Sequence, residues 1–96
     1  MDKIFYRKGT ICKGGFVNEQ VIGYNVFVQF YGLSFEDRVH IANKISFLVK
    51  DYSGVVIEYD PVPSYNPSYI SAEFKLEEAA DYFIKNLKLE FDAVQK

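Results

Sequence analysis

The chain has 96 residues, of which 49% are hydrophobic and 25% are charged. This length suits one domain spanning residues 1–96, and this composition excludes an intrinsically disordered chain. Eleven basic and 13 acidic side chains give a formal net charge of −2. That balance argues against a protein that neutralises many phosphate groups.

Cysteine content and apolar runs indicate the compartment. Cys12 is the only cysteine, which excludes a scaffold held by intramolecular disulfides and favours a reducing compartment. After Met1 there is no apolar stretch of signal-peptide length, and nowhere do 18 apolar residues follow one another. We therefore expect a cytoplasmic protein that does not enter the membrane. Lys outnumbers Arg, a bias common in AT-rich genomes of bacteria, phages and plasmids.

The first part of the chain predicts strands. Residues 3–8 suggest a short strand, and a second is predicted over Thr10–Val17, with a bulge or weak point at Gly14–Gly15. A short hairpin connection at Asn18–Gln20 leads to Val21–Tyr31, where side chains alternate between two faces. This last segment is the clearest strand in the sequence.

A helix is predicted over Phe35–Asp51. Ser34 is followed three residues later by Asp37, which resembles a capping box at the start of a helix. Apolar side chains then fall within one arc of the helix. They are Phe35, Val39, Ile41, Ala42, Ile45, Leu48 and Val49.

The second half repeats this order of elements. Val55–Asp60 is β-branched and predicts a short strand, Asp60–Ser68 holds all three prolines and predicts a rigid loop, and Tyr69–Lys75 alternates again. A second helix is predicted over Leu76–Val94. Its apolar stripe consists of Leu76, Ala80, Phe83, Leu87, Phe91 and Val94.

The predicted fold class is α+β with the element order ββαββα. Hairpins favour an antiparallel sheet, and two amphipathic helices need one sheet face to cover them, so we expect a two-layer sandwich with both helices on one face. The other face is left to solvent or to a partner. Even-numbered side chains are expected to form the inner face: Ile22, Val26, Val28, Phe30, Ile70, Ala72 and Phe74.

The sequence shows no motif that carries chemistry. Cys12 and His40 are the only cysteine and histidine, whereas a structural zinc site takes four nitrogen or sulfur ligands. No nucleophile signature or phosphate-binding loop is present. We predict no catalytic residue, no metal ion and no cofactor, and expect the protein not to be an enzyme.

Several aromatic side chains are expected outside the core, where they suit contact with a partner. Phe47 and His40 lie seven residues apart on the polar side of the first helix, the spacing of anchors on a docking helix. Tyr82 and Leu89 have the same spacing on the second helix and suggest a homodimer interface. Tyr65 lies in the proline-rich loop, whose stiff backbone reduces the entropic cost of binding.

The open sheet face offers another candidate surface. Phe27, Tyr31 and Tyr69 are expected there and form a platform on which nucleic-acid bases stack in some proteins. Against that function, Glu58 and Glu73 are expected on the same face and no basic stripe accompanies the rings. Nucleic acid is therefore the less favoured ligand.

Together these features predict a small cytosolic, non-enzymatic module that binds another protein, as an inhibitor or adaptor encoded by a phage or mobile element. Two alternatives stay open. One is a single-strand nucleic-acid-binding protein that uses the aromatic sheet face. The other is an enzyme whose site assembles only in an oligomer.

Overall fold

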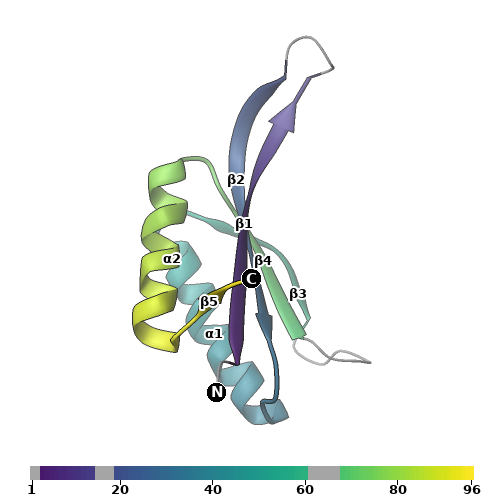
Figure 1. The fold of residues 1–96 in the computed structure, drawn as a ribbon, viewed down its shortest axis with the longest axis vertical. Coiled ribbons are helices and arrows are strands. Elements are labelled where there is room, and N and C mark those ends of the chain that lie inside the picture. The colour runs from purple at the N-terminus through teal and green to yellow at the C-terminus, as the bar shows by residue number, and fades with distance from the viewer. Residues whose placement is uncertain (1–2, 15–18, 61–67) are drawn as a thin grey trace.

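The computed structural model describes residues 3–14, 19–60 and 68–96, and it confirms the α+β class (Figure 1). Within these ranges the chain forms five strands and two helices. The strands are Ile4–Lys13 (β1), Gln20–Phe30 (β2), Val55–Asp60 (β3), Ser68–Phe74 (β4) and Val94–Gln95 (β5). The helices are Phe35–Asp51 (α1) and Glu77–Phe91 (α2).

The five strands form one mixed sheet in the order β3-β4-β2-β1-β5. Its first four strands are antiparallel to their neighbours, whereas β5 pairs with β1 in parallel. The prediction of a purely antiparallel sheet is therefore wrong at this edge. Asp92 adopts a left-handed conformation with φ of 52° and ends α2, so that Val94 pairs with Phe5 instead of continuing the helix.

The first hairpin is longer and differently divided than predicted. β1 is one continuous strand and ends at Lys13, because β2 offers it a hydrogen-bonding partner along almost its whole length. The predicted strand Thr10–Val17 is thus wrong at its start, and residues 15–18, including Gly15 of the expected bulge, lie outside the described residues. The register shift instead falls between Ile11 and Cys12.

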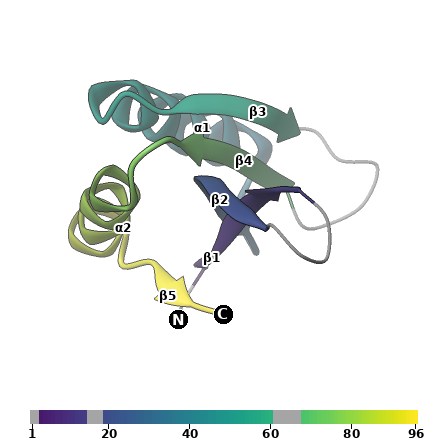
Figure 2. The same cartoon turned by 90° about the horizontal axis from the view of Figure 1, so that it is seen from above.

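Both helices lie on the same side of the sheet (Figure 2). The core fills the space between the sheet and the helices. The predicted inner face is confirmed at six positions, all of them buried: Val26, Val28, Phe30, Ile70, Ala72 and Phe74. The prediction that Ile22 belongs to the inner face is wrong, because 52% of its surface is exposed. Cys12 pairs with Val21 and Ile11 with Gly23, so the bulge leaves Ile22 outside the regular alternation.

The far end of the β1–β2 hairpin projects beyond both helices as a two-stranded arm (Figure 1). We define the arm by Ile11–Lys13 and Gln20–Ile22, the paired segments nearest the connection between the strands. Val21 and Ile22 are exposed there. The arm therefore presents apolar side chains that no helix covers.

The ends of the helices explain two further differences from the sequence-based expectations. Ser34 caps α1 as predicted, and its Oγ accepts a hydrogen bond from the backbone N–H of Asp37 at 3.2 Å. Phe35, expected to face the sheet, is 50% exposed because α1 begins beyond the end of the sheet (Figure 1). Leu76 is exposed because it is the N-cap residue of α2 and precedes the helix.

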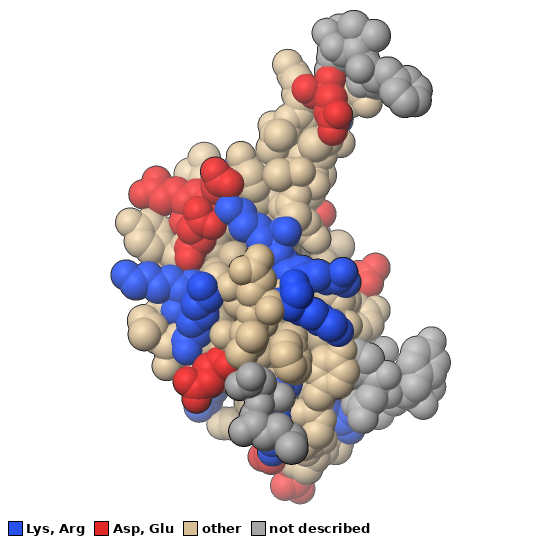
Figure 3. All heavy atoms as spheres, in the orientation of Figure 1, with Lys and Arg blue, Asp and Glu red and all other residues tan. Residues whose placement is uncertain are grey.

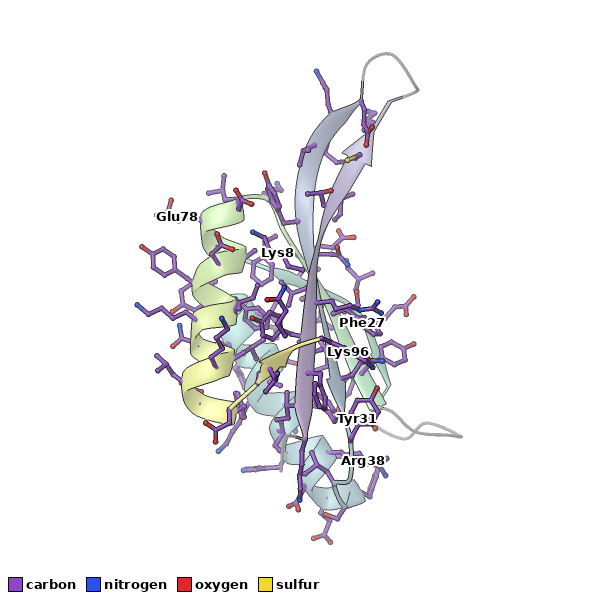
Figure 4. All side chains as sticks on the ribbon, in the orientation of Figure 1. Lys8, Phe27, Tyr31, Arg38, Glu78 and Lys96 are labelled. Carbon is purple, nitrogen blue, oxygen red and sulfur yellow. The ribbon has the colours of Figure 1, made fainter. Side chains whose placement is uncertain are left out.

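Lys8 joins β1 to the first turns of α2 (Figure 4). Its Nζ lies 2.8 Å from Oε2 of Glu77 and 2.8 Å from Oδ1 of Asp81. The hydrogen bond to Asp81, followed by that to Glu77, raises the pKa of Lys8 above its ordinary value of 10.5. These contacts fix the N-terminal end of α2 over the sheet.

Truncation of neighbouring residues on β2 should separate the two sheet faces. We expect Phe30→Ala to lower the free energy of unfolding by about 3 to 5 kcal/mol, because its ring is fully buried. Phe27→Ala should lower it by only about 1 kcal/mol, because that ring is only partly buried and loses mainly one aromatic contact. Urea unfolding measures both values. Equal losses would mean that both faces of the sheet are buried.

The Lys8 ion pairs should contribute to stability only while Lys8 is charged. Because its pKa is raised in the folded protein, the contribution is complete below the unfolded value of 10.5 and is lost as the pH rises through the folded value. Lys8→Met should cost up to about 1 kcal/mol at neutral pH, since both carboxylates are half-exposed. The difference between wild type and variant in urea unfolding should shrink as the pH rises above 10.5. A constant difference would contradict this role.

Candidate interaction surface

The outer face of the sheet, which points away from the helices, carries odd-numbered side chains of β1, β2 and β4. Antiparallel pairing aligns Arg7 with Phe27 and Phe27 with Ser71, so these three side chains lie side by side across the sheet. Tyr31 extends this face beyond β2, because its backbone N–H donates to the carbonyl of Lys3 at 2.8 Å. The face therefore continues from the middle of the sheet to the start of β1.

Four aromatic rings on the outer face form two pairs. The ring centroids of Phe27 and Tyr69 are 5.3 Å apart. Those of Phe5 and Tyr31 are 5.4 Å apart and meet edge to face, with 84° between their planes. Figure 4 shows Phe27 and Tyr31 on the same side of the sheet, away from the helices. The structure thus brings together Phe27, Tyr31 and Tyr69 as predicted and adds Phe5.

One edge of the outer face is basic. Nζ of Lys96 donates to the hydroxyl oxygen of Tyr31 at 2.6 Å and to Oε1 of Gln29 at 3.0 Å, and it lies 5.0 Å from the centroid of the Tyr31 ring. Arg7 is exposed on β1 and makes no ion pair within the part of the chain that the structure describes. Lys and Arg side chains gather around the middle of β1 (Figure 3).

The opposite edge of the outer face is acidic. Glu58 pairs with Ser71 in the sheet, and its Oε2 accepts a hydrogen bond from the Tyr69 hydroxyl at 3.1 Å. Glu73 pairs with Asn25 and is exposed. Both carboxylates lie on the outer face, as the sequence predicted. The aromatic rings therefore lie between a basic edge on β1 and an acidic edge on β3 and β4.

The other predicted contact residues lie on the helices, on the opposite side of the sheet (Figure 2). Phe47 is 68% exposed, and Nζ of Lys50 lies 5.8 Å from the centroid of its ring. His40 is exposed on the same helix. Tyr65, the remaining predicted anchor, lies outside the described residues.

Tyr82 and Leu89, predicted as a dimer interface, do not share one hollow. Tyr82 stacks on Tyr52, with 6.2 Å between the ring centroids and 12° between their planes, and Nδ2 of Asn86 donates to the Tyr52 hydroxyl at 2.7 Å. Tyr82 and Tyr52 line a groove of about 590 Å³ together with Leu76. Leu89 is 71% exposed and does not line that groove.

Cys12 and His40, the only cysteine and the only histidine in the sequence, lie on different elements of the fold. Cys12 lies in the arm on β1, whereas His40 lies on α1. A hydrogen bond with the Glu19 carboxylate is the main cause that raises the pKa of Cys12 above its ordinary value of 9.0. The thiol therefore stays protonated at neutral pH and is a poor nucleophile.

Within the described ranges, no group of three or more His, Cys, Asp or Glu side chains is placed to hold a metal ion. Neither helix there has the length and apolar character needed to cross a membrane. No protein-family model, curated protein or solved structure matches the chain.

Removing the carboxylate near Cys12 should make its thiol more reactive. We expect Glu19→Gln to lower the pKa of Cys12 and therefore to increase the rate of its alkylation by iodoacetamide at about pH 8. Alkylation of both proteins in concentrated urea is the control and should proceed at equal rates. An unchanged rate in the folded variant would show that Glu19 does not act on the thiol.

Proposed function

We propose that this protein is a non-enzymatic module that binds another protein through the outer face of its sheet. The observation that carries the proposal is the set of aromatic rings between a basic and an acidic edge. Protein interfaces concentrate aromatic residues and Arg at their centre and surround them with a polar rim. The proposed setting is the cytoplasm, where the module would act as an inhibitor or adaptor.

In this proposal the fold has two layers, one formed by the helices and one by the sheet, and its elements follow the order ββαββα before the short β5. In such an arrangement the helices occupy one sheet face and leave the other to a partner. Phe27 and Tyr31 are partly exposed whereas Phe30 is fully buried, which supports this assignment.

The distribution of charge favours a protein partner over nucleic acid. Glu58 and Glu73 would repel a phosphate backbone that crossed the aromatic rings, and the chain has a net charge of −2. A folded protein surface carries both signs of charge and can complement both edges. Arg7 adds a planar donor group suited to a partner carboxylate.

Single-strand nucleic acid is the second candidate, and a specific observation favours it. Lys96 lies over the Tyr31 ring, and Arg7 neighbours Phe27 across the β1–β2 ladder. Proteins that bind single strands without sequence preference combine cationic side chains, which contact the phosphates, with aromatic rings, on which the bases stack. Such a strand would follow the β1 half of the outer face and avoid Glu58 and Glu73.

Affinity capture from the protein's own cytosol tests the proposal. We expect the wild type to retain one stoichiometric protein, and Phe27→Ala to weaken that complex by roughly 2 kcal/mol while the domain stays folded. Phe47→Ala is the matched control, because it removes an equally large ring from the helix side. Loss of the complex only in Phe47→Ala would place the contact on α1. Retention of nucleic acid alone, released by salt, would favour the second candidate.

A further inference from the structure

The outer face is complementary to itself. Pairing across the four antiparallel strands sets Arg7 on β1, Phe27 on β2, Ser71 on β4 and Glu58 on β3 in one row. The midline of this row lies between β2 and β4. Arg7 and Glu58 each lie on the second strand from this midline, on opposite sides of it. They are therefore at equal distances from the midline and carry opposite charges.

We propose that the outer face binds a second copy of this chain, with the two sheets packed face to face about a two-fold axis that runs along the strands between β2 and β4. The proposal rests on the proposed function and names the partner of the same surface. A rotation of 180° about that axis lays β1 of each copy over β3 of the other. Arg7 of each copy then faces Glu58 of the other copy, which forms two equivalent ion pairs.

The next row across the sheet obeys the same symmetry. It consists of Gly9, Asn25, Glu73 and Val55. The rotation sets Asn25 opposite Glu73 of the other copy, where its amide can donate to the carboxylate. It also sets Val55, which is 60% exposed, opposite Gly9, where the side chain of Asn25 lies in the space that a Cβ would take.

The centre of the interface would be aromatic and its rim charged. Phe27 and Tyr69 lie on the two strands next to the axis, so the rings of both copies meet near it. Arg7 and Glu58 lie on the flanking strands, farther from the axis. An apolar centre inside a polar rim is the usual anatomy of a protein interface, and sheets of natural twist pack in this aligned manner.

The proposed symmetry has a consequence for the arms. Because the axis runs along the strands, the arms of both copies extend towards the same end of the dimer. The helices remain on the two outer sides, so Phe47 and the groove lined by Tyr52 and Tyr82 stay accessible to other molecules.

Substitutions that reverse the charge of Arg7 or of Glu58 test this proposal. Sedimentation velocity over a range of concentrations should show a dimer for the wild type, and Arg7→Glu and Glu58→Arg should each raise its dissociation constant by about tenfold or more. An equimolar mixture of the two variants should dimerise like the wild type, because each altered side chain then meets an opposite charge. A chain with both substitutions should also dimerise. Lys85→Glu and Glu90→Arg, exposed on α2, are the charge-matched controls and should change nothing.

The remaining outcomes overturn the proposal in distinguishable ways. Failure of the mixture to dimerise would contradict the two-fold arrangement. Dimers that persist in both single variants would place self-association elsewhere, for example at Tyr82 and Leu89. A wild type that stays monomeric but loses a captured protein in Phe27→Ala would leave the proposed function standing without the homodimer. A wild type that stays monomeric and binds its captured protein independently of Phe27 would contradict both the homodimer and the proposed function of the outer face.

Discussion

The hydrogen-bonded register of β2 is the constraint on which the rest of the structure depends. This strand pairs with β1 on one side and with β4 on the other, and its side chains alternate between two faces. A slip of one residue would turn Val28 and Phe30 out of the core and bury Phe27 and Gln29 instead. The same ladder therefore determines both the core under the helices and the composition of the outer face.

Each face has a chemistry that the other lacks. The inner face is aliphatic and aromatic without charge at its centre, and it is closed by α1 and α2. The outer face places rings beside Arg7 and Lys96 at one edge and beside Glu58 and Glu73 at the other. Lys8 belongs to the inner side of β1 and serves stability by holding α2, whereas its neighbour Arg7 points outward and makes no ion pair among the described residues. Of these two adjacent residues, Lys8 thus contacts a helix of its own chain, and Arg7 is the one that we propose to contact a partner.

The sequence predicts what depends on short-range patterns. Alternation on β2 correctly places Val26 and Phe30 inside and Phe27 outside, and the Ser34 cap correctly begins α1. What depends on pairing between distant segments could not be predicted. The bulge that displaces Ile22 and the return of the chain after Asp92, which brings Lys96 onto the Tyr31 ring, have no local signature.

The residues of the outer face also differ in whether short-range patterns could predict them. Phe27, Tyr31 and Tyr69 were predicted on one face from alternation alone, but Phe5 was missed because its segment was not predicted to continue along the whole of β2. The alignment of Arg7 with Glu58 requires three successive strand registers, one of them shifted by a bulge near Ile57. No pattern within a single segment contains that information.

The central claim is that the outer face is open in the isolated chain and is covered when the protein binds. Hydroxyl-radical footprinting with mass spectrometry, from dilute to concentrated protein, tests it within one molecule. The account predicts that Phe30 is protected at every concentration, that Phe47 is oxidised at every concentration, and that Phe27 changes from oxidised to protected as the protein associates. Protection of Phe27 in the dilute monomer, equal to that of Phe30, would contradict the account.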